Sequence, residues 1–266
     1  MFSNEPKRHP ALKVVSLKPY NAEIPLSLAA DSFYTPNDLF YVRNHLGTPS
    51  FDNEDEYELD ISGIGLPEGG KTLKLNDIKQ LPKYEVVSTI QCGGNRRAEM
   101  KAVKDLKGLP WTGGAIGNAK WGGARLYDVL KAAGNPTIIL ILLCGQDFTH
   151  GRREYHFSNL SYAYVGLRED EIRAKHVQFE GYDKGADGSP YGASIPISKA
   201  FTPYGDVLLA YEMNGETLPR DHGYPIRAVV PGVVGARNVK WLNNIIGIYN
   251  FGLDQTHGDY FRLAHL

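Results

Sequence analysis

The chain has 266 residues, of which 42% are hydrophobic, and this length favours one large domain with a sizeable core. Its 29 lysines and arginines balance 30 aspartates and glutamates, which argues against a strongly basic surface for nucleic acid or for an acidic membrane. Two cysteines without CxxC spacing argue against a disulfide scaffold and are typical of a compartment that keeps thiols reduced.

The ends of the chain bear on its location. The ten N-terminal residues lack the apolar run of a secretory signal. The longest apolar run, Ile138 to Cys144, is too short to span a bilayer. We therefore predict a soluble intracellular protein. The last three residues, Ala264-His265-Leu266, loosely match the peroxisomal SKL signal, so we expect the peroxisome or the cytoplasm in preference to the mitochondrial intermembrane space.

Short elements are predicted along the chain. Alternation of polar and apolar residues predicts a half-buried strand over Tyr57–Ile61. Apolar residues at helical spacing predict a helix around Leu126–Leu130, with Gly134 as its C-terminal cap. The β-branched run Thr137–Leu143 predicts a fully buried strand.

The C-terminal half continues in the same manner. Val207–Tyr211 is predicted to be a strand that leads into a tight turn at Asn214-Gly215. Further strands are predicted over Ile226–Val230 and Val239–Ile248, and Pro231 interrupts any ladder between them. Without a steady βαβ rhythm, the prediction is an α+β fold with mixed sheets and short helices. Neither G-x-G-x-x-G after a strand nor a P-loop occurs, which argues against nicotinamide cofactors and P-loop nucleotide chemistry.

One segment combines a cysteine, glycines and arginines. It reads STIQCGGNRR and covers Ser88 to Arg97. Glycines allow a sharp turn that presents N–H groups, and nearby guanidinium groups favour the thiolate of Cys92 over the thiol. A thiolate is a soft ligand suited to a metal centre. The alternative is an ordinary turn with solvated arginines. Cys144, in contrast, ends an apolar run and is predicted to be an inert core thiol.

A second segment is rich in basic side chains. Arg220 to Arg227 and Gly235 to Trp241 together contain five of them within a glycine-broken span. Arginine can hold a phosphate through two hydrogen bonds, so this segment is suited to a phosphorylated cofactor, although a solvated charged loop is the alternative.

A third segment, Tyr41 to His45, places Arg43 and His45 two residues apart. On a strand these two side chains would share one face. By contrast, we interpret the isolated His150, His156 and His176 as ordinary surface or core residues rather than ligands.

Taken together, these segments resemble the molybdenum-cofactor domain of the sulfite oxidase family. Five stretches agree in order over about Pro36 to Trp241. They are YVRNH (Tyr41 to His45), STIQCGGNRRAEM (Ser88 to Met100), GLPW with WGGAR (Gly108 to Trp111 and Trp121 to Arg125), YGASIP (Tyr191 to Pro196), and the run from Leu208 to Trp241.

The resemblance implies a role for each site residue. Cys92 would supply the protein's thiolate to molybdenum, beside the dithiolene of one molybdopterin. The implied substrate-pocket residues are Arg43 and Arg97, which would attract the sulfite dianion, together with Trp111 and Tyr260. The residues implied to hold the molybdopterin and its phosphate are Tyr41, Val42, Arg43, Asn44, His45, Asp183, His222, Arg227, Asn238, Val239 and Lys240.

The resemblance also shapes expectations for the surrounding protein. Typical members continue into an immunoglobulin-like dimerisation domain, and animal members begin with a haem domain. We expect neither here, and therefore predict one molybdenum-cofactor domain over residues 1–266, without haem, most similar to the plant-type enzymes. The expected substrate is sulfite, the expected electron acceptor is oxygen or a separate cytochrome, and the expected state is a monomer or weak homodimer.

Three alternatives remain open at this point. A nitrate-reducing relative would use the same domain and a similar cysteine loop. A molybdopterin carrier would hold the cofactor without turnover. The arginines could also form a sulfate- or phosphate-binding surface that needs no metal.

Overall fold

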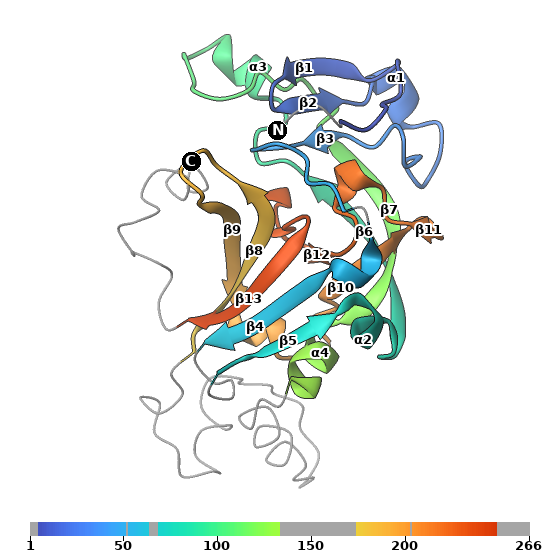
Figure 1. The fold of residues 1–266 in the computed structure, drawn as a ribbon. Coiled ribbons are helices and arrows are strands. Elements are labelled where there is room, and N and C mark those ends of the chain that lie inside the picture. The colour runs from blue at the N-terminus through green and yellow to red at the C-terminus, as the bar shows by residue number, and fades with distance from the viewer. Residues whose placement is uncertain (1–4, 52, 64–68, 134–173, 203, 249–266) are drawn as a thin grey trace, which may run out of the picture.

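The computed structural model describes residues 5–51, 53–63, 69–133, 174–202 and 204–248. Within these ranges the chain forms three sheets and a few short helices (Figure 1). The predicted α+β class is confirmed. Among the described residues, no helix combines the length and the apolar character needed to cross a membrane.

A small N-terminal sheet has the order β1-β2-β3. Its strands are β1 (Lys13–Leu17), β2 (Tyr20–Glu23) and β3 (Val42–Arg43), and α1 (Leu26–Ala29) follows β2. Figure 1 shows this sheet at one end of the molecule, beside α3 (Arg97–Lys101).

The second sheet carries the cysteine segment. Its order is β11-β10-β7-β6, and β12 also pairs with β10. The strands are β6 (Lys83–Gln91), β7 (Ile116–Arg125), β10 (Leu208–Met213), β11 (Glu216–Thr217) and β12 (Arg227–Val229). Gly123 of β7 permits the close approach of β10, because a Cβ there would collide with the backbone of Leu209 and Ala210.

The third sheet has the order β5-β4-β13-β8-β9, in which only the β4–β13 pair among these neighbours is parallel. Its strands are β4 (Glu58–Gly63), β5 (Lys71–Lys74), β8 (His176–Lys184), β9 (Pro190–Pro196) and β13 (Leu242–Ile248). The helices α2 (Leu75–Lys79), α4 (Leu126–Ala132) and α7 (Ile197–Ala200) and the 3-10 turns η1 (Glu54–Glu56), η2 (Arg220–His222) and η3 (Gly235–Arg237) complete the described elements.

The largest core cluster joins the second and third sheets. It contains Leu59 of β4, Leu130 of α4, Phe179 of β8, Leu209 of β10 and Ile245 of β13. A smaller cluster around Trp111 and Trp121 lies behind the cysteine segment. The two clusters include residues of β6, β8 and β12 and Tyr41 just before β3, so their burial holds these segments in place.

Several sequence-based predictions are confirmed. The strand expected over Tyr57–Ile61 is β4, the helix expected around Leu126–Leu130 is α4, and Val207–Tyr211 corresponds to β10 with its turn at Asn214-Gly215. Gly134, Thr137–Leu143 and Cys144 lie outside the described residues.

Two predictions were wrong in extent. The strand expected from Val239 begins only at Leu242, because Trp241 has a positive φ of 51° and its backbone leaves the extended region. The strand at Tyr41–His45 ends at Arg43, so Arg43 and His45 do not share a strand face. The interruption expected at Pro231 is confirmed, since β12 and β13 belong to different sheets.

Candidate molybdopterin-binding site

The thiol of Cys92 lies in the turn that directly follows β6. The Cys92 amide donates to Ala115 O at 3.0 Å, and Cys92 O accepts from the Asn95 amide at 3.0 Å. The Gly94 amide points at Cys92 Sγ, with a separation of 3.4 Å. The left-handed residue of the turn is Arg96, with φ 64°, and neither glycine is needed for that conformation. This turn therefore presents a free, half-buried sulfur with an N–H group directed at it.

The glycines serve a different purpose here, because they leave room for Arg97 in the position that it adopts. A Cβ on Gly94 would lie 2.7 Å from the Arg97 guanidinium, and one on Gly108 would lie 2.8 Å from Arg97 Nη1. Arg97 Nη1 donates to Leu109 O at 3.0 Å. Two glycines and one carbonyl thus fix the guanidinium beside the cysteine turn.

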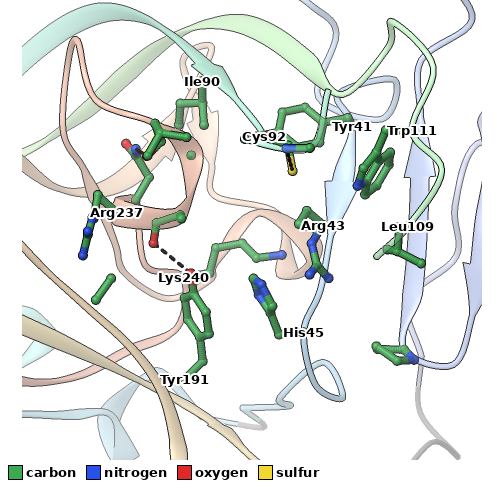
Figure 2. Close-up of a pocket in the computed structure, with 18 of the residues that line it drawn as sticks. Tyr41, Arg43, His45, Ile90, Cys92, Leu109, Trp111, Tyr191, Arg237 and Lys240 are labelled. Carbon is green, nitrogen blue, oxygen red and sulfur yellow. Dashed lines mark hydrogen bonds between the residues drawn. The ribbon is translucent and has the colours of Figure 1, made fainter. Parts of the chain in front are cut away.

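Arg43 approaches the sulfur from β3. Its Nη1 donates to Asn44 O at 2.6 Å and to Asn21 Oδ1 at 3.1 Å. Burial lowers the pKa of Arg43 and the Arg97 charge lowers it further, while Cys92 opposes this effect. Figure 2 shows Arg43 and Trp111 on the side of the cavity that holds Cys92. We call Cys92, Arg43, Arg97 and Trp111 the cysteine end.

Basic side chains from the second motif gather at a second part of the same cavity. Lys240 Nζ donates to Asp221 O at 2.8 Å and also to Asn44 Oδ1. Arg227 donates to His222 O at 2.8 Å and to Asn238 O at 2.9 Å. Burial lowers the pKa of Arg227 to about 10 and lowers the pKa of Lys240. We call Lys240, His222, Arg227, Asn238 and Asp183 the lysine end.

His222 is neutral and its tautomer is fixed. Its Nε2 lies 2.7 Å from Asn37 O, and a carbonyl only accepts, so Nε2 carries the hydrogen. Burial lowers the pKa of His222 to about 4. His45 is likewise held neutral, because burial and the charges of Arg43 and Lys240 lower its pKa. Its ring stacks on Tyr191 at 4.3 Å between centroids.

Two buried polar atoms on the cavity wall lack a hydrogen-bond partner among the described residues. They are Asp183 Oδ1 at the lysine end and Trp111 Nε1 at the cysteine end. Burial raises the pKa of Asp183, and the Lys240 charge opposes this rise. An unsatisfied acceptor and an unsatisfied donor are costly inside a protein, so both atoms are suited to meeting a polar ligand.

The cavity has a volume of about 570 Å³, which suits a cofactor-sized ligand. Most sequence-predicted site residues line it: Tyr41, Arg43, His45, Cys92, Arg97, Trp111, Asp183, His222, Arg227, Asn238 and Lys240. Val42 and Val239 are instead buried in the protein, and Asn44 is buried where it accepts from Lys240. Tyr260, His150 and His156 lie outside the described residues.

Not every basic residue of the second motif reaches the cavity, although the sequence had suggested that all would. Arg220 is not among the cavity-lining residues, and its Nε donates to Pro49 O at 3.2 Å. His176, interpreted as an ordinary residue, lies in β8 and does not line the cavity.

Some lining residues were not assigned a role from the sequence. Tyr191, Asp221 and Arg237 were inside motifs already singled out, so the motif boundaries could have indicated them. Pro19 and Lys107 carry no local signal, because their position depends on how the N-terminal sheet and the segment after α3 pack.

Comparisons with known proteins now assign the family. A family described as "Oxidoreductase molybdopterin binding domain" matches residues 45–249. The chain belongs to this family. Its fold agrees with the crystal structure of the sulfane dehydrogenase SoxCD from Paracoccus pantotrophus, with a TM-score of 0.61 and 24% identity over 94% of this chain and 50% of that one.

The curated relatives of this molybdopterin-binding chain include sulfite oxidases. The mitochondrial sulfite oxidase of Drosophila melanogaster is 51% identical over 92% of the chain, and the sulfite oxidase of Arabidopsis thaliana is 46% identical over 92%. An NADPH nitrate reductase of Aspergillus niger is 36% identical over 88%. The chain spans 36%, 55% and 23% of these three proteins, respectively.

The cavity fits a molybdopterin on chemical grounds. One free thiol is a suitable protein ligand for a metal whose other ligands come from the cofactor. The unsatisfied Asp183 carboxyl can accept from pterin N–H groups, and the cations of the lysine end suit a phosphate.

Proposed function

We propose that the chain binds a molybdenum cofactor through the Cys92 thiolate and oxidises sulfite to sulfate. The observation that carries this proposal is the joining of two different ends in one cavity. A free thiol with two arginines and a buried tryptophan lines the same cavity as a group of basic side chains. The two groups adjoin at Asn44, which accepts from both Arg43 and Lys240. The sulfite oxidases among the relatives support sulfite as the substrate.

The cysteine end accounts for anion binding. Arg43 and Arg97 line the cavity beside Cys92, and their positive charges attract and orient a sulfite anion. Arg43 is half-buried, which strengthens its attraction for an anion relative to the same charge in water. Trp111 Nε1 supplies a further donor for a sulfite oxygen. When bound, the molybdenum cofactor supplies a metal that accepts two electrons and exchanges an oxygen atom.

The lysine end accounts for cofactor binding. Lys240, Arg227 and Arg237 present positive charge for the phosphate of the molybdopterin. Neutral His222 and His45 avoid adding further repulsion to this cluster of cations. The carbonyls of Asp221, His222 and Asn238 hold Lys240 and Arg227 in place, so binding requires little side-chain reorganisation.

Several finer expectations remain predictions. Oxygen or a separate cytochrome is the predicted electron acceptor. The chain itself is predicted to be one molybdenum-cofactor domain that binds no haem. A monomer or weak homodimer is the predicted state. The peroxisome or cytoplasm is the predicted compartment, whereas the Drosophila relative is named as mitochondrial.

Molybdenum analysis combined with a sulfite assay on Cys92→Ser tests the proposal. The purified wild-type protein is expected to contain about one molybdenum per chain and to reduce ferricyanide in the presence of sulfite. Serine lacks a soft thiolate, so Cys92→Ser is expected to lose the sulfite-dependent signal by a factor on the order of a hundred or more. Lys79→Ala, which removes a surface ion pair with Glu54, serves as the control for folding.

The same assay separates the three alternatives. Turnover of nitrate with a reduced dye, in place of sulfite turnover, would identify a nitrate reductase. Stoichiometric molybdenum without turnover of either substrate would identify a cofactor carrier. A wild-type protein that takes up no molybdenum in a host that makes the cofactor would contradict the proposal and would favour a sulfate- or phosphate-binding surface that needs no metal.

A further inference from the structure

Arg8 joins the N-terminal segment to a loop of the cofactor site. Its Nε donates to Asp221 Oδ2 at 2.8 Å and its Nη2 donates to Asp221 Oδ1 at 2.9 Å. The side chains of Arg8 and Asp221 are only 12% and 9% exposed. The guanidinium also lies 3.8 Å from the centre of the Tyr20 ring and pairs with Glu5. A bidentate, largely buried ion pair of this kind is much better ordered than an ordinary surface ion pair.

Arg8 precedes the part of the chain that matches the family, which begins at residue 45. Its partner Asp221 lies in η2, 213 positions further along the chain. Asp221 and Pro19 both line the cavity. The pair therefore fastens the N-terminal segment to the wall of the site, and the contact of Arg8 with Tyr20 of β2 extends this link to the N-terminal sheet.

The loop that Arg8 holds carries the acceptors of the lysine end. Asp221 O accepts from Lys240 Nζ, and the next carbonyl, His222 O, accepts from Arg227. The backbone position of these two carbonyls determines where the two cations point. A shift of η2 would move both.

We propose that Arg8 is a positioning residue, which clamps Asp221 so that the η2 carbonyls hold Lys240 and Arg227 toward the phosphate of the bound cofactor. This inference rests on the proposed function, because it concerns how the same cavity retains its cofactor. Arg8 does not touch the cofactor or substrate in this role. It acts through Asp221.

The charges around Lys240 predict a second effect of Arg8, on the pKa of Lys240. Lys240 is surrounded by Asp221 of η2, Arg227 of β12, Asp183 of β8 and Arg43 of β3, with His45 and His222 nearby. Asp221 raises the pKa of Lys240, while burial and the two arginines lower it. Without Arg8 to share the Asp221 carboxylate, we expect the pKa of Lys240 to rise.

The test compares cofactor release from purified wild-type, Arg8→Ala and Arg8→Lys holoenzymes. The measurement is the molybdenum and pterin that remain bound after timed gel filtration, over a range of pH values. Supporting residues behind a ligand typically change affinity roughly 10–100-fold, so release from Arg8→Ala is expected to be faster by about this factor. Arg8→Lys keeps the charge and is expected to restore part of the retention. Lys79→Ala is the control for loss of an ion pair outside the site.

The pH dependence distinguishes positioning from general destabilisation. Protonated Lys240 favours retention of a phosphate, so release should accelerate as the pH rises through the pKa of Lys240. In Arg8→Ala the midpoint of this acceleration should move to higher pH, whereas in Arg8→Lys it should stay close to the wild-type value. The KM for sulfite of molecules that remain loaded should not change.

Release from Arg8→Ala at the wild-type rate would overturn the inference while leaving the proposed function intact. Equal acceleration at every pH would also overturn it, because that result indicates only a weaker fold. If Arg8→Ala does not fold, Arg8→Gln, which also removes the charge, takes its place, with the same faster release and the same upward shift of the midpoint expected. A wild-type protein without molybdenum would overturn the proposed function, and the clamp with it.

Discussion

The cysteine end and the lysine end of the cavity are built differently. At the lysine end, Lys240 and Arg227 are held by backbone carbonyls of η2 and of Asn238, the residue after η3. The Asn238 side chain donates to and accepts from its own loop. At the cysteine end, Arg43 and Arg97 each use only Nη1 for hydrogen bonds to the described part of the protein. The difference indicates that one end is a preassembled scaffold, whereas the other keeps donors available for a ligand.

The largest expected effect comes from removing a cation of the scaffold. Arg227→Met leaves the buried carbonyls of His222 and Asn238 without their donor, at about 1–3 kcal/mol each. We expect the cofactor-free protein to lose about 4 kcal/mol in its free energy of unfolding, and the holoenzyme to lose most of its molybdenum. Urea unfolding and metal analysis measure both. Unchanged stability would show that the lysine end is not preassembled.

The second largest expected effect is a loss of folding stability at acidic pH, caused by His222 at the lysine end. His222 has a pKa of about 4 in the folded protein, below its ordinary value of 6.5. Between these two values the unfolded chain binds more protons, so stability is full above about pH 6.5 and falls as the pH drops toward 4. For His222 the loss approaches about 3 kcal/mol. His45 contributes in the same direction.

The matched variant for this pH effect is His222→Gln, which keeps a donor for Asn37 O but does not titrate. Urea unfolding of the cofactor-free protein at pH 7 and pH 4.5 should show a smaller difference for the variant than for the wild type. An identical loss of unfolding free energy between pH 7 and pH 4.5 in the two proteins would contradict the buried, neutral state of His222.

A smaller effect on free energy, but a selective one, is expected at the cysteine end. Arg97→Gln removes a charge beside Cys92 without breaking the scaffold, so kcat/KM for sulfite should fall about a hundredfold, or about 2.7 kcal/mol, while molybdenum content stays unchanged. Arg96→Lys, on the exposed neighbour that pairs with Glu99, is the control. Loss of molybdenum from Arg97→Gln would remove the distinction between the two ends.

The two ends also differ in how far the sequence could predict them. The cysteine motif was predictable because Cys92, Gly94 and Arg97 are close in sequence, and a short turn brings them together. What the sequence did not reveal was the purpose of Gly94. Its lack of a Cβ makes room for Arg97, and this requirement depends on tertiary packing.

The cavity residues outside the cysteine motif depend on the whole fold. Arg43 and His45 were expected to share a strand face, but β3 ends at Arg43 and the two reach the cavity by different backbone paths. The strand that was expected from Val239 begins only at Leu242, and the irregular backbone before it, with the positive φ of Trp241, places Lys240 in the cavity. Long-range contacts such as Arg8 with Asp221 have no local pattern at all.

Protection of the Cys92 thiol is the most direct measurement of the central claim. Native holoenzyme and cofactor-free protein would be treated with iodoacetamide, and modification of the Cys92 peptide would be followed by mass spectrometry, separately from the Cys144 peptide. We predict that Cys92 is protected in the holoenzyme and modified once the cofactor is removed. Equal modification of Cys92 in both proteins, with molybdenum still bound, would contradict the account.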